Sequence, residues 1–257
     1  MNDEAQRNQL QQAVCAGNED ALMSALAAGF KVNAKDGFGQ TLLMLAAEAG
    51  KEKITELLIA AKANLDTRDQ FSYLDGGGKT ALHRAVENRH VKVVNMLLDA
   101  GAKVDVVDKM ARTPLEFAIG NKDLEIAETL LKAGANPNGS GKATTPLASA
   151  AALKSSEAVE SLLTHGADPN HPADVDSPVL GYAALLDMVE SCRLLLKAGA
   201  KVNAKNSDGR TAFDIISKPV DPTVWKRLSA AQAEELKQAL QKREEIKAML
   251  IEAAQST

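Results

Sequence analysis

The sequence predicts an all-α solenoid of about seven helix-turn-helix units with short hairpin loops, closed by a C-terminal capping helix. Three observations lead to this fold class: a Leu-Leu-x-x-Gly-Ala phrase that recurs at a nearly constant interval, a Thr-containing phrase ahead of each expected first helix, and an aromatic content of only 3%. A protein with one large core normally fills its centre with aromatic side chains. A chain rich in Ala and Leu instead favours thin helical layers that pack closely.

The Leu-Leu-x-x-Gly-Ala phrase sets the period of the repeat. Its clearest glycines are Gly101, Gly134, Gly166 and Gly199, at intervals of 33, 32 and 33 residues. Weaker copies of the phrase end at Asn33 and Asp66. A glycine directly after a helix suits a left-handed C-terminal cap, where a side chain would be strained. The phrase therefore predicts the end of each second helix, with its leucines in the seam between units.

The second phrase predicts where each first helix begins. Its copies are Thr41-Leu42-Leu43, Thr80-Ala81-Leu82-His83, Thr113-Pro114-Leu115, Thr145-Pro146-Leu147 and Thr211-Ala212-Phe213, with Pro178-Val179-Leu180 in the matching frame of the sixth unit. A Thr side chain can accept hydrogen bonds from the orphan N–H groups of a helix, and Pro is pre-organised for the first turn. Paired alanines such as Ala46-Ala47 and Ala183-Ala184 would let neighbouring helices approach closely.

Taken together, the two phrases resemble the ankyrin repeat, over roughly residues 5 to 217. The resemblance implies a solenoid in which each unit is stabilised by the neighbour that covers it. We place the array at 1–217 and a C-terminal helical cap at 218–257. The expected units are 5–35, 36–68, 69–107, 108–140, 141–172, 173–205 and 206–217 onward.

A charged helix is expected near 229–254, after the break at Lys218-Pro219. Its apolar residues fall on one stripe at helical spacing: Leu236, Ala239, Leu240, Ile246 and Leu250. We interpret this helix as a cap on the last repeat. A coiled-coil dimer is the alternative, although Arg243 and Lys247 interrupt the stripe.

Composition argues against several classes of partner. The formal net charge is −4 with no run rich in Lys and Arg, so a nucleic-acid partner is not expected. No apolar stretch is long enough to span a membrane. The acidic N-terminus is unlike a secretory signal. With two cysteines predicted too far apart to bridge, we expect a cytoplasmic monomer, or a periplasmic or secreted one if a signal segment has been removed.

The sequence gives no support for an enzyme, a metal site or a cofactor. No His-Glu-x-x-His or Cys-x-x-Cys pattern is present. The four histidines, His83, His90, His165 and His171, fit structural positions of the repeat. Gly76-Gly77-Gly78-Lys79-Thr80 superficially matches a phosphate loop, but the upstream position that needs Gly holds Tyr73. We predict no catalytic residue.

The resemblance implies binding to a protein partner, unidentified here, through hairpin tips and the concave groove. The second interval of the repeat, from Thr41 to Thr80, is 39 residues long, six more than the common period. The extra residues lie within 69–78 and include Phe71, Tyr73 and Leu74. Inserted residues in repeat arrays often lie on the binding face, although these side chains could also fold back onto the scaffold.

A second candidate surface lies on the first helices of the fifth and sixth units. Polar groove positions such as Glu48 and Glu87 give way there to Leu153 and to Leu185-Leu186. We predict that these leucines, with Tyr182, form the main docking surface; the alternative is that the C-terminal helices cover them. The remaining candidate tip residues are Phe38, Met110 and Arg112.

The function expected from these observations is that of an adaptor, scaffold or inhibitor. A bacterial secreted effector or an immunity-type inhibitor that uses the same groove is the alternative. The resemblance also makes Asn33 and Asn203 candidate sites for asparagine hydroxylation.

The repeat pattern predicts a single elongated, right-handed stack of helix pairs. Far-ultraviolet circular dichroism should show mainly helix, and small-angle scattering should give the profile of an elongated particle. The profile of a compact sphere would contradict the repeat array.

Overall fold

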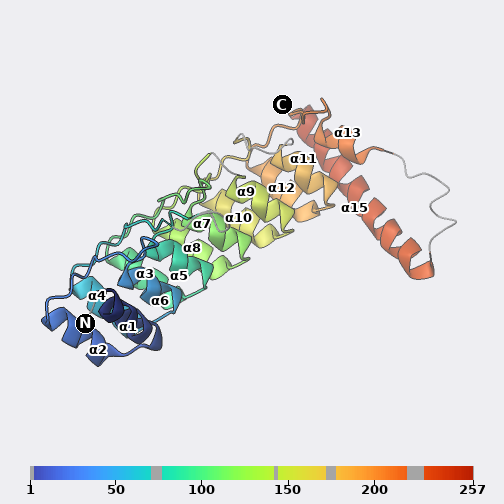
Figure 1. Cartoon of the computed structure of the whole chain (residues 1–257). Helices are drawn as coiled ribbons and strands as arrows, with labels where there is room; N and C mark the ends of the chain where they lie inside the picture. The colour runs from blue at the N-terminus through green and yellow to red at the C-terminus, as the bar shows by residue number, and fades with distance from the viewer. Residues whose placement is uncertain (1–2, 71–76, 142–143, 172–177, 219–228, 257) are drawn as a thin grey trace. The chain divides into compact units, whose positions relative to one another are not determined.

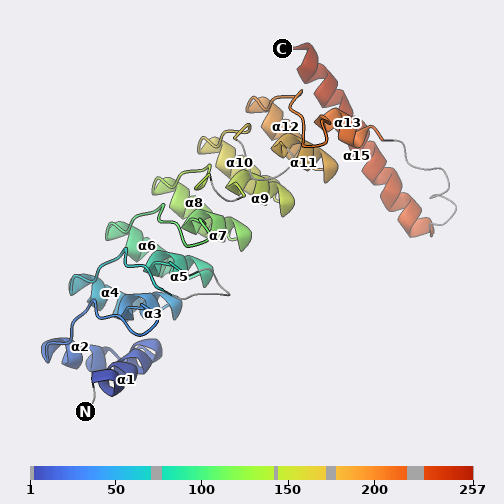
Figure 2. The ribbon, with the colours of Figure 1, turned by 45° about the horizontal axis from the view of Figure 1, so that its top comes forward.

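The computed structural model describes residues 3–70, 77–141, 144–171, 178–218 and 229–256 (Figure 1). Within these ranges the regular secondary structure is helical, and no strand occurs. The chain divides into two compact units, Met1–Ala143 and Thr144–Thr257. The predicted all-α repeat fold is confirmed, and each unit consists of stacked helix pairs (Figure 2).

Unit 1 holds four helix pairs. They are α1 (Asp3–Ala16) with α2 (Glu19–Ala27), α3 (Leu42–Glu48) with α4 (Glu52–Ala60), α5 (Ala81–Glu87) with α6 (Val91–Asp99), and α7 (Pro114–Gly120) with α8 (Leu124–Lys132). The first helices pack in the order α1, α3, α5 and α7, and the second helices pack in the order α2, α4, α6 and α8. Each pair therefore lies against the next, as nearest-neighbour stacking requires.

Unit 2 holds two further pairs and a different ending. The pairs are α9 (Pro146–Ala152) with α10 (Ser156–Thr164) and α11 (Val179–Leu185) with α12 (Val189–Lys197). They are followed by α13 (Ala212–Ile216), a first helix of only five residues, and by α15 (Ala230–Gln255), which has 26 residues. α15 packs against α12 and α13. The long helix α15 thus lies where a regular repeat would place a nine-residue second helix.

The threonines of the second phrase cap the first helices as predicted. Each accepts a hydrogen bond from the backbone N–H three residues later: Thr41, Thr80, Thr113, Thr145 and Thr211. α11 begins at Pro178, which provides no side-chain cap. The alanine pairs that follow, such as Ala46-Ala47 and Ala183-Ala184, are fully buried. Because alanine is small, the first helices of successive repeats come into direct contact there.

The glycine of the repeat phrase is required by backbone geometry. Gly101 and Gly134 have φ values of 89° and 90°, in the left-handed region that side chains rarely adopt. In the second repeat, Lys62 after α4 takes the equivalent position with φ 63°. The chain direction therefore reverses in the same way with a less favourable residue.

α15 closes the end of unit 2 with part of its apolar stripe. Ile246 and Leu250 are buried, whereas Leu236, Ala239 and Leu240 in its first half are half-buried. The C-terminal half of the stripe therefore does most of the capping.

Two ion pairs hold α15 in place. Arg243 was expected to interrupt the apolar stripe, but its Nε lies 2.8 Å from Oδ1 of Asp187, in the α11–α12 connection. Arg193 on α12 pairs with Glu245 at 3.1 Å. The charge at position 243 thus belongs to the contact between the cap and the array.

His83 has a structural role on α5. It is buried, its Nδ1 lies 2.9 Å from the Thr80 hydroxyl, and its Nε2 lies 3.3 Å from the Arg112 carbonyl oxygen. Burial lowers the pKa of this imidazole from 6.5 to about 4. The folded state therefore keeps His83 neutral at pH values where the unfolded chain would protonate it.

We expect this histidine to make the fold sensitive to acid. Between about pH 6.5 and about pH 4 the unfolded state binds a proton at this position that the folded state does not, so the free energy of unfolding falls as the pH falls. Urea unfolding at about pH 7.5 and about pH 4.5 should show a larger loss for the wild type than for His83→Gln. Equal losses in the two proteins would contradict the assignment.

Candidate functional site

The first helices of unit 2 expose an apolar surface, the leucine patch, which consists of Leu153, Tyr182, Leu185 and Leu186. Leu153 and Leu186 are the C-cap residues of α9 and α11, two helices that pack side by side. Leu185 keeps 50% of its surface exposed, and the other three residues are half-buried. The C-terminal helix α15 therefore does not bury Leu185.

Two of the equivalent helix ends in unit 1, Glu48 of α3 and Glu87 of α5, are charged and pair with buried cations. Lys79 is only 1% exposed, and its ammonium lies 2.9 and 3.0 Å from the two carboxylate oxygens of Glu87. Arg84 lies 2.7 Å from the buried carboxylate of Asp69 and 3.9 Å from the partly exposed carboxylate of Glu48. The carboxylates of Glu48 and Glu87, at the ends of two first helices, thus balance buried cations of unit 1.

Sequence reasoning missed this network, although part of its signal was present. Arg84 and Glu87 stand three residues apart, a spacing that places side chains on the same helix face. Lys79 was considered only as part of a phosphate-loop pattern. Its ammonium is instead held by Glu87 and lies 5.3 Å from the centre of the Phe117 ring.

Two hairpin tips of unit 1 expose apolar side chains. Phe38 is 57% exposed and Met110 is 58% exposed. At each tip an aspartate organises the turn, because Asp36 Oδ1 accepts the N–H of Phe38 at 2.9 Å and Asp108 Oδ1 accepts the N–H of Met110 at 2.9 Å. Both apolar side chains are therefore presented by short turns with fixed backbone hydrogen bonds.

Arg112 lies at the same tip as Met110 but makes internal contacts. Its guanidinium lies 2.8 Å from Asp108 Oδ2 and 4.3 Å from the centre of the Phe117 ring. The remaining predicted tip residues, Phe71, Tyr73 and Leu74, lie outside the described residues.

The structure gives the two cysteines no activated environment. Burial and the Glu48 carboxylate raise the pKa of the Cys15 thiol above its usual 9.0. Burial raises the pKa of the Cys192 thiol to about 12, with a further contribution from Asp187. Since the thiolate is the nucleophile, neither side chain is poised for covalent catalysis at neutral pH.

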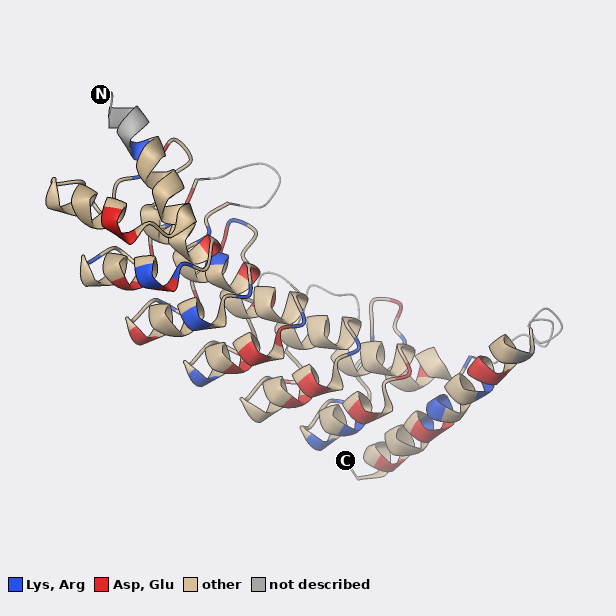
Figure 3. Ribbon diagram, turned by 90° about the horizontal axis from the view of Figure 1, so that it is seen from below, with Lys and Arg blue, Asp and Glu red and all other residues tan. Residues whose placement is uncertain are grey.

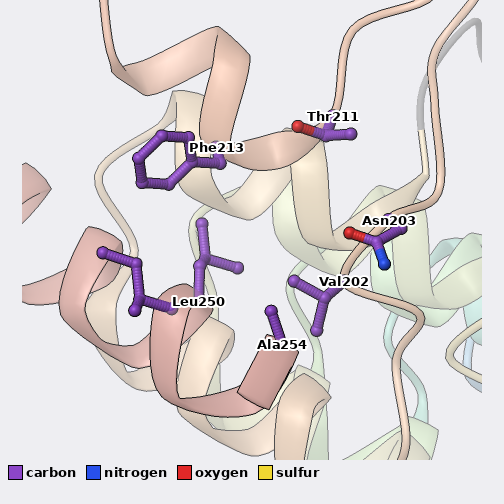
Figure 4. A pocket seen from close by; sticks show the side chains of 7 residues that line it. Val202, Asn203, Thr211, Phe213, Leu250 and Ala254 are labelled. Carbon is purple, nitrogen blue, oxygen red and sulfur yellow. The ribbon is translucent and has the colours of Figure 1, made fainter. Parts of the chain in front are cut away.

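A small cavity of about 230 Å³ lies at the end of unit 2 between α13, α15 and the preceding hairpin (Figure 4). Leu250, Phe213 and Val202 contribute to its mostly apolar lining, and Phe213 is 37% exposed. None of its seven lining residues is ionisable. The cavity can accept an apolar group but offers no ionisable acid or base.

The described part of the chain offers neither a metal site nor a membrane-spanning helix. No three His, Cys, Asp or Glu side chains of that part are placed to hold a metal ion. None of its helices is long and apolar enough to cross a membrane.

Comparison with known proteins establishes the family. The family model for ankyrin repeats (three copies) matches residues 10–108, 78–141 and 100–173, which together span more than half of the 257 residues. The chain belongs to the ankyrin-repeat family. Ankyrin repeat domains mediate protein–protein interactions, and their fold is a scaffold that does not typically carry catalysis.

The relatives by sequence are longer proteins. A putative ankyrin repeat-containing protein of Treponema pallidum is 36% identical over 124 residues, covering 48% of this chain and 40% of that protein. The putative ankyrin repeat protein FPV014 of fowlpox virus is 34% identical over 105 residues, covering 40% of this chain and 23% of the viral protein. The chain thus spans less than half the length of these two curated relatives.

Two solved structures of ankyrin repeat domains match most of the chain. The human ASB11 domain has a TM-score of 0.66 at 28% identity, covering 91% of this chain and 96% of that domain. The domain of Bcl-3, a member of the IkappaB protein family, has a TM-score of 0.70 at 27% identity, covering 80% of this chain and 92% of its own. These likenesses support the repeat architecture.

We expect that residues 71–76 can be deleted without loss of the fold. The N–H of Asp69 donates to the Lys79 carbonyl at 3.0 Å, and the N–H of Lys79 donates to Asp69 Oδ1 at 3.0 Å, so the base of this connection is closed by its own hydrogen bonds. Deletion also restores the common repeat length. The midpoint of thermal unfolding should be nearly unchanged.

Asp69→Ala provides the contrast for the deletion. It removes the carboxylate that balances the buried Arg84, and breaking a buried ion pair costs about 3–5 kcal/mol. If the deletion destabilises the protein as much as Asp69→Ala does, residues 71–76 are part of the core and do not form a dispensable loop.

Proposed function

We propose that this protein is an adaptor, scaffold or inhibitor that holds a protein partner on the leucine patch of unit 2. The observation that carries the proposal is the 50% exposure of Leu185, beside the half-buried Leu153, Tyr182 and Leu186. Exposed apolar patches on soluble proteins commonly mark interaction sites. Tyrosine is also enriched at such interfaces, because its ring is apolar and its hydroxyl can hydrogen-bond.

The way these side chains are held supports the proposal. The alanine pairs of α9 and α11 are fully buried, which fixes both helices and the residues that follow each pair. A surface that needs little ordering loses little entropy when it binds. Fully burying a leucine side chain contributes about 1.5–3 kcal/mol, so a few such contacts are enough to anchor a partner.

We expect that Leu185→Ser combined with Leu186→Ser weakens partner binding at least about tenfold, which corresponds to about 1.4 kcal/mol. The partner would first be captured from a native extract with the wild-type protein and identified by mass spectrometry. Its affinity for both proteins would then be measured by calorimetry. The change should cost little stability, because Leu185 is half exposed.

The matched control is Met23→Ser with Leu124→Ser, which also replaces two exposed apolar residues but on the second helices of unit 1. This control should bind as the wild type does. The proposal fails if the two double variants bind alike. It also fails if the Leu185 and Leu186 variant loses several kcal/mol of folding stability, since the leucines would then be core residues.

A further inference from the structure

The exposed charged side chains on the hairpin connections of unit 1 are nearly all cations. In residues 28–41, 61–70, 77–80 and 100–113, six cations are exposed and Asp105 is the single exposed carboxylate. The exposed cations are Lys31, Lys35, Lys62, Arg68, Lys103 and Lys109. A chain whose formal net charge is −4 therefore presents mainly positive side chains along this part of its surface.

The second helices of the same unit have the opposite bias. On α2, α4, α6 and α8 six carboxylates are exposed against three lysines. The acidic ones are Glu19, Asp20, Glu52, Glu56, Asp99 and Glu125. Figure 3 marks the acidic and basic residues along the ribbon. The two surfaces of unit 1 thus differ in sign.

Three aspartates of the hairpins, Asp36, Asp69 and Asp108, are engaged in the turns or the interior, which contributes to the positive bias. Asp69 and Asp108 are both buried. Asp69 binds Arg84, and Asp108 binds Arg112. Asp36 is half-buried and accepts hydrogen bonds from two backbone N–H groups of its own tip and from the side chain of Gln11. These carboxylates serve the turns and the interior, so the exposed charged side chains of these hairpins are mainly cations.

Lys109, which precedes Met110 at its tip, reaches the hairpin that lies between Met110 and Phe38. The N–H of Gln70 donates to the Phe38 carbonyl at 2.8 Å, and the Lys109 ammonium lies 3.4 Å from the Gln70 carbonyl oxygen. Arg68 donates to the Gly78 carbonyl at 3.2 Å. The N–H of Lys109 donates to the Gly77 carbonyl at 2.9 Å. Successive hairpins are thereby tied to one another by backbone groups.

We infer that this hairpin edge, formed by Lys35, Phe38, Arg68, Lys109 and Met110, binds an acidic segment of a partner protein that carries an aromatic or aliphatic anchor residue. Phe38 and Met110 supply apolar contacts, and the cations supply complementary charge. Complementary charge at an interface increases the association rate and selects among partners, and the effect weakens with salt. The inference rests on the proposed function in that the protein acts by binding proteins, but it concerns a different surface.

The test uses the full-length protein and a displayed library of random peptides as the probe. We expect the wild type to select peptides in which Asp or Glu residues neighbour an aromatic or aliphatic residue. Lys35→Glu with Lys109→Glu should weaken the binding of these peptides at least about tenfold, and raised salt should weaken it in the wild type. Phe38→Ser with Met110→Ser should weaken it as well.

The matched control is Lys53→Glu with Lys92→Glu, which changes the net charge equally but on α4 and α6, where both lysines are exposed. It should bind the selected peptides as the wild type does. Circular dichroism checks the fold of each variant. If the charge reversal at Lys35 and Lys109 disturbs the fold, Lys35→Gln with Lys109→Gln replaces it.

The inference is overturned if the library yields no acidic peptides, or if the selected peptides bind the Lys35 and Lys109 variant as tightly as the wild type. Peptides that lose binding only with Leu185→Ser and Leu186→Ser would support the leucine patch and reject the hairpin edge. Peptides sensitive only to the hairpin changes would support this inference while the leucine patch fails.

Discussion

Each short helix of this protein depends on the neighbour that covers it. The first helices from α3 to α11 have seven residues each, and the second helices from α2 to α12 have nine. Isolated helices shorter than about 12–15 residues are only marginally stable in water. The helices persist because buried alanine pairs let successive repeats touch and because leucines such as Leu97 and Leu162 fill the seams between repeats. The stability of the fold therefore depends on the contacts between neighbouring repeats.

This dependence separates structural positions from positions that are available for recognition. Residues in the seams are fixed by packing and cannot contact a partner. Some positions after the alanine pairs are also fixed, because Glu48 and Glu87 pair with buried cations. Exposed side chains at the hairpin tips and at the ends of the first helices, such as Met110 and Leu185, can vary without loss of the stack. The leucine patch and the hairpin edge both consist of such positions. They differ in chemistry, since one is apolar and the other combines apolar residues with cations.

The last repeat shows what happens where the next neighbour is missing. Phe213 occupies the position of the buried leucine in other first helices, yet it is 37% exposed. α15 covers this end with Ile246, Leu250 and the ion pair between Arg243 and Asp187, but a small cavity remains beside Phe213. A single helix does not reproduce the surface of a helix pair, so it closes the end incompletely.

The sequence by itself determined the repeat, its period, the threonine caps and the glycine turns, because each of these is set by residues close together in the chain. It also located the C-terminal helix, since an apolar stripe at helical spacing is a local pattern. It did not reveal that Lys79 and Asp69 are buried or that Arg112 contacts its own tip, and it left open whether α15 covers Leu185. Apart from the contact of Arg112 with Asp108, four residues away, those outcomes depend on residues separated by eight to more than fifty positions, such as Lys79 with Glu87 and Asp187 with Arg243. Only the tertiary structure brings such groups together, and it alone decides which charges are neutralised inside the protein and which are exposed.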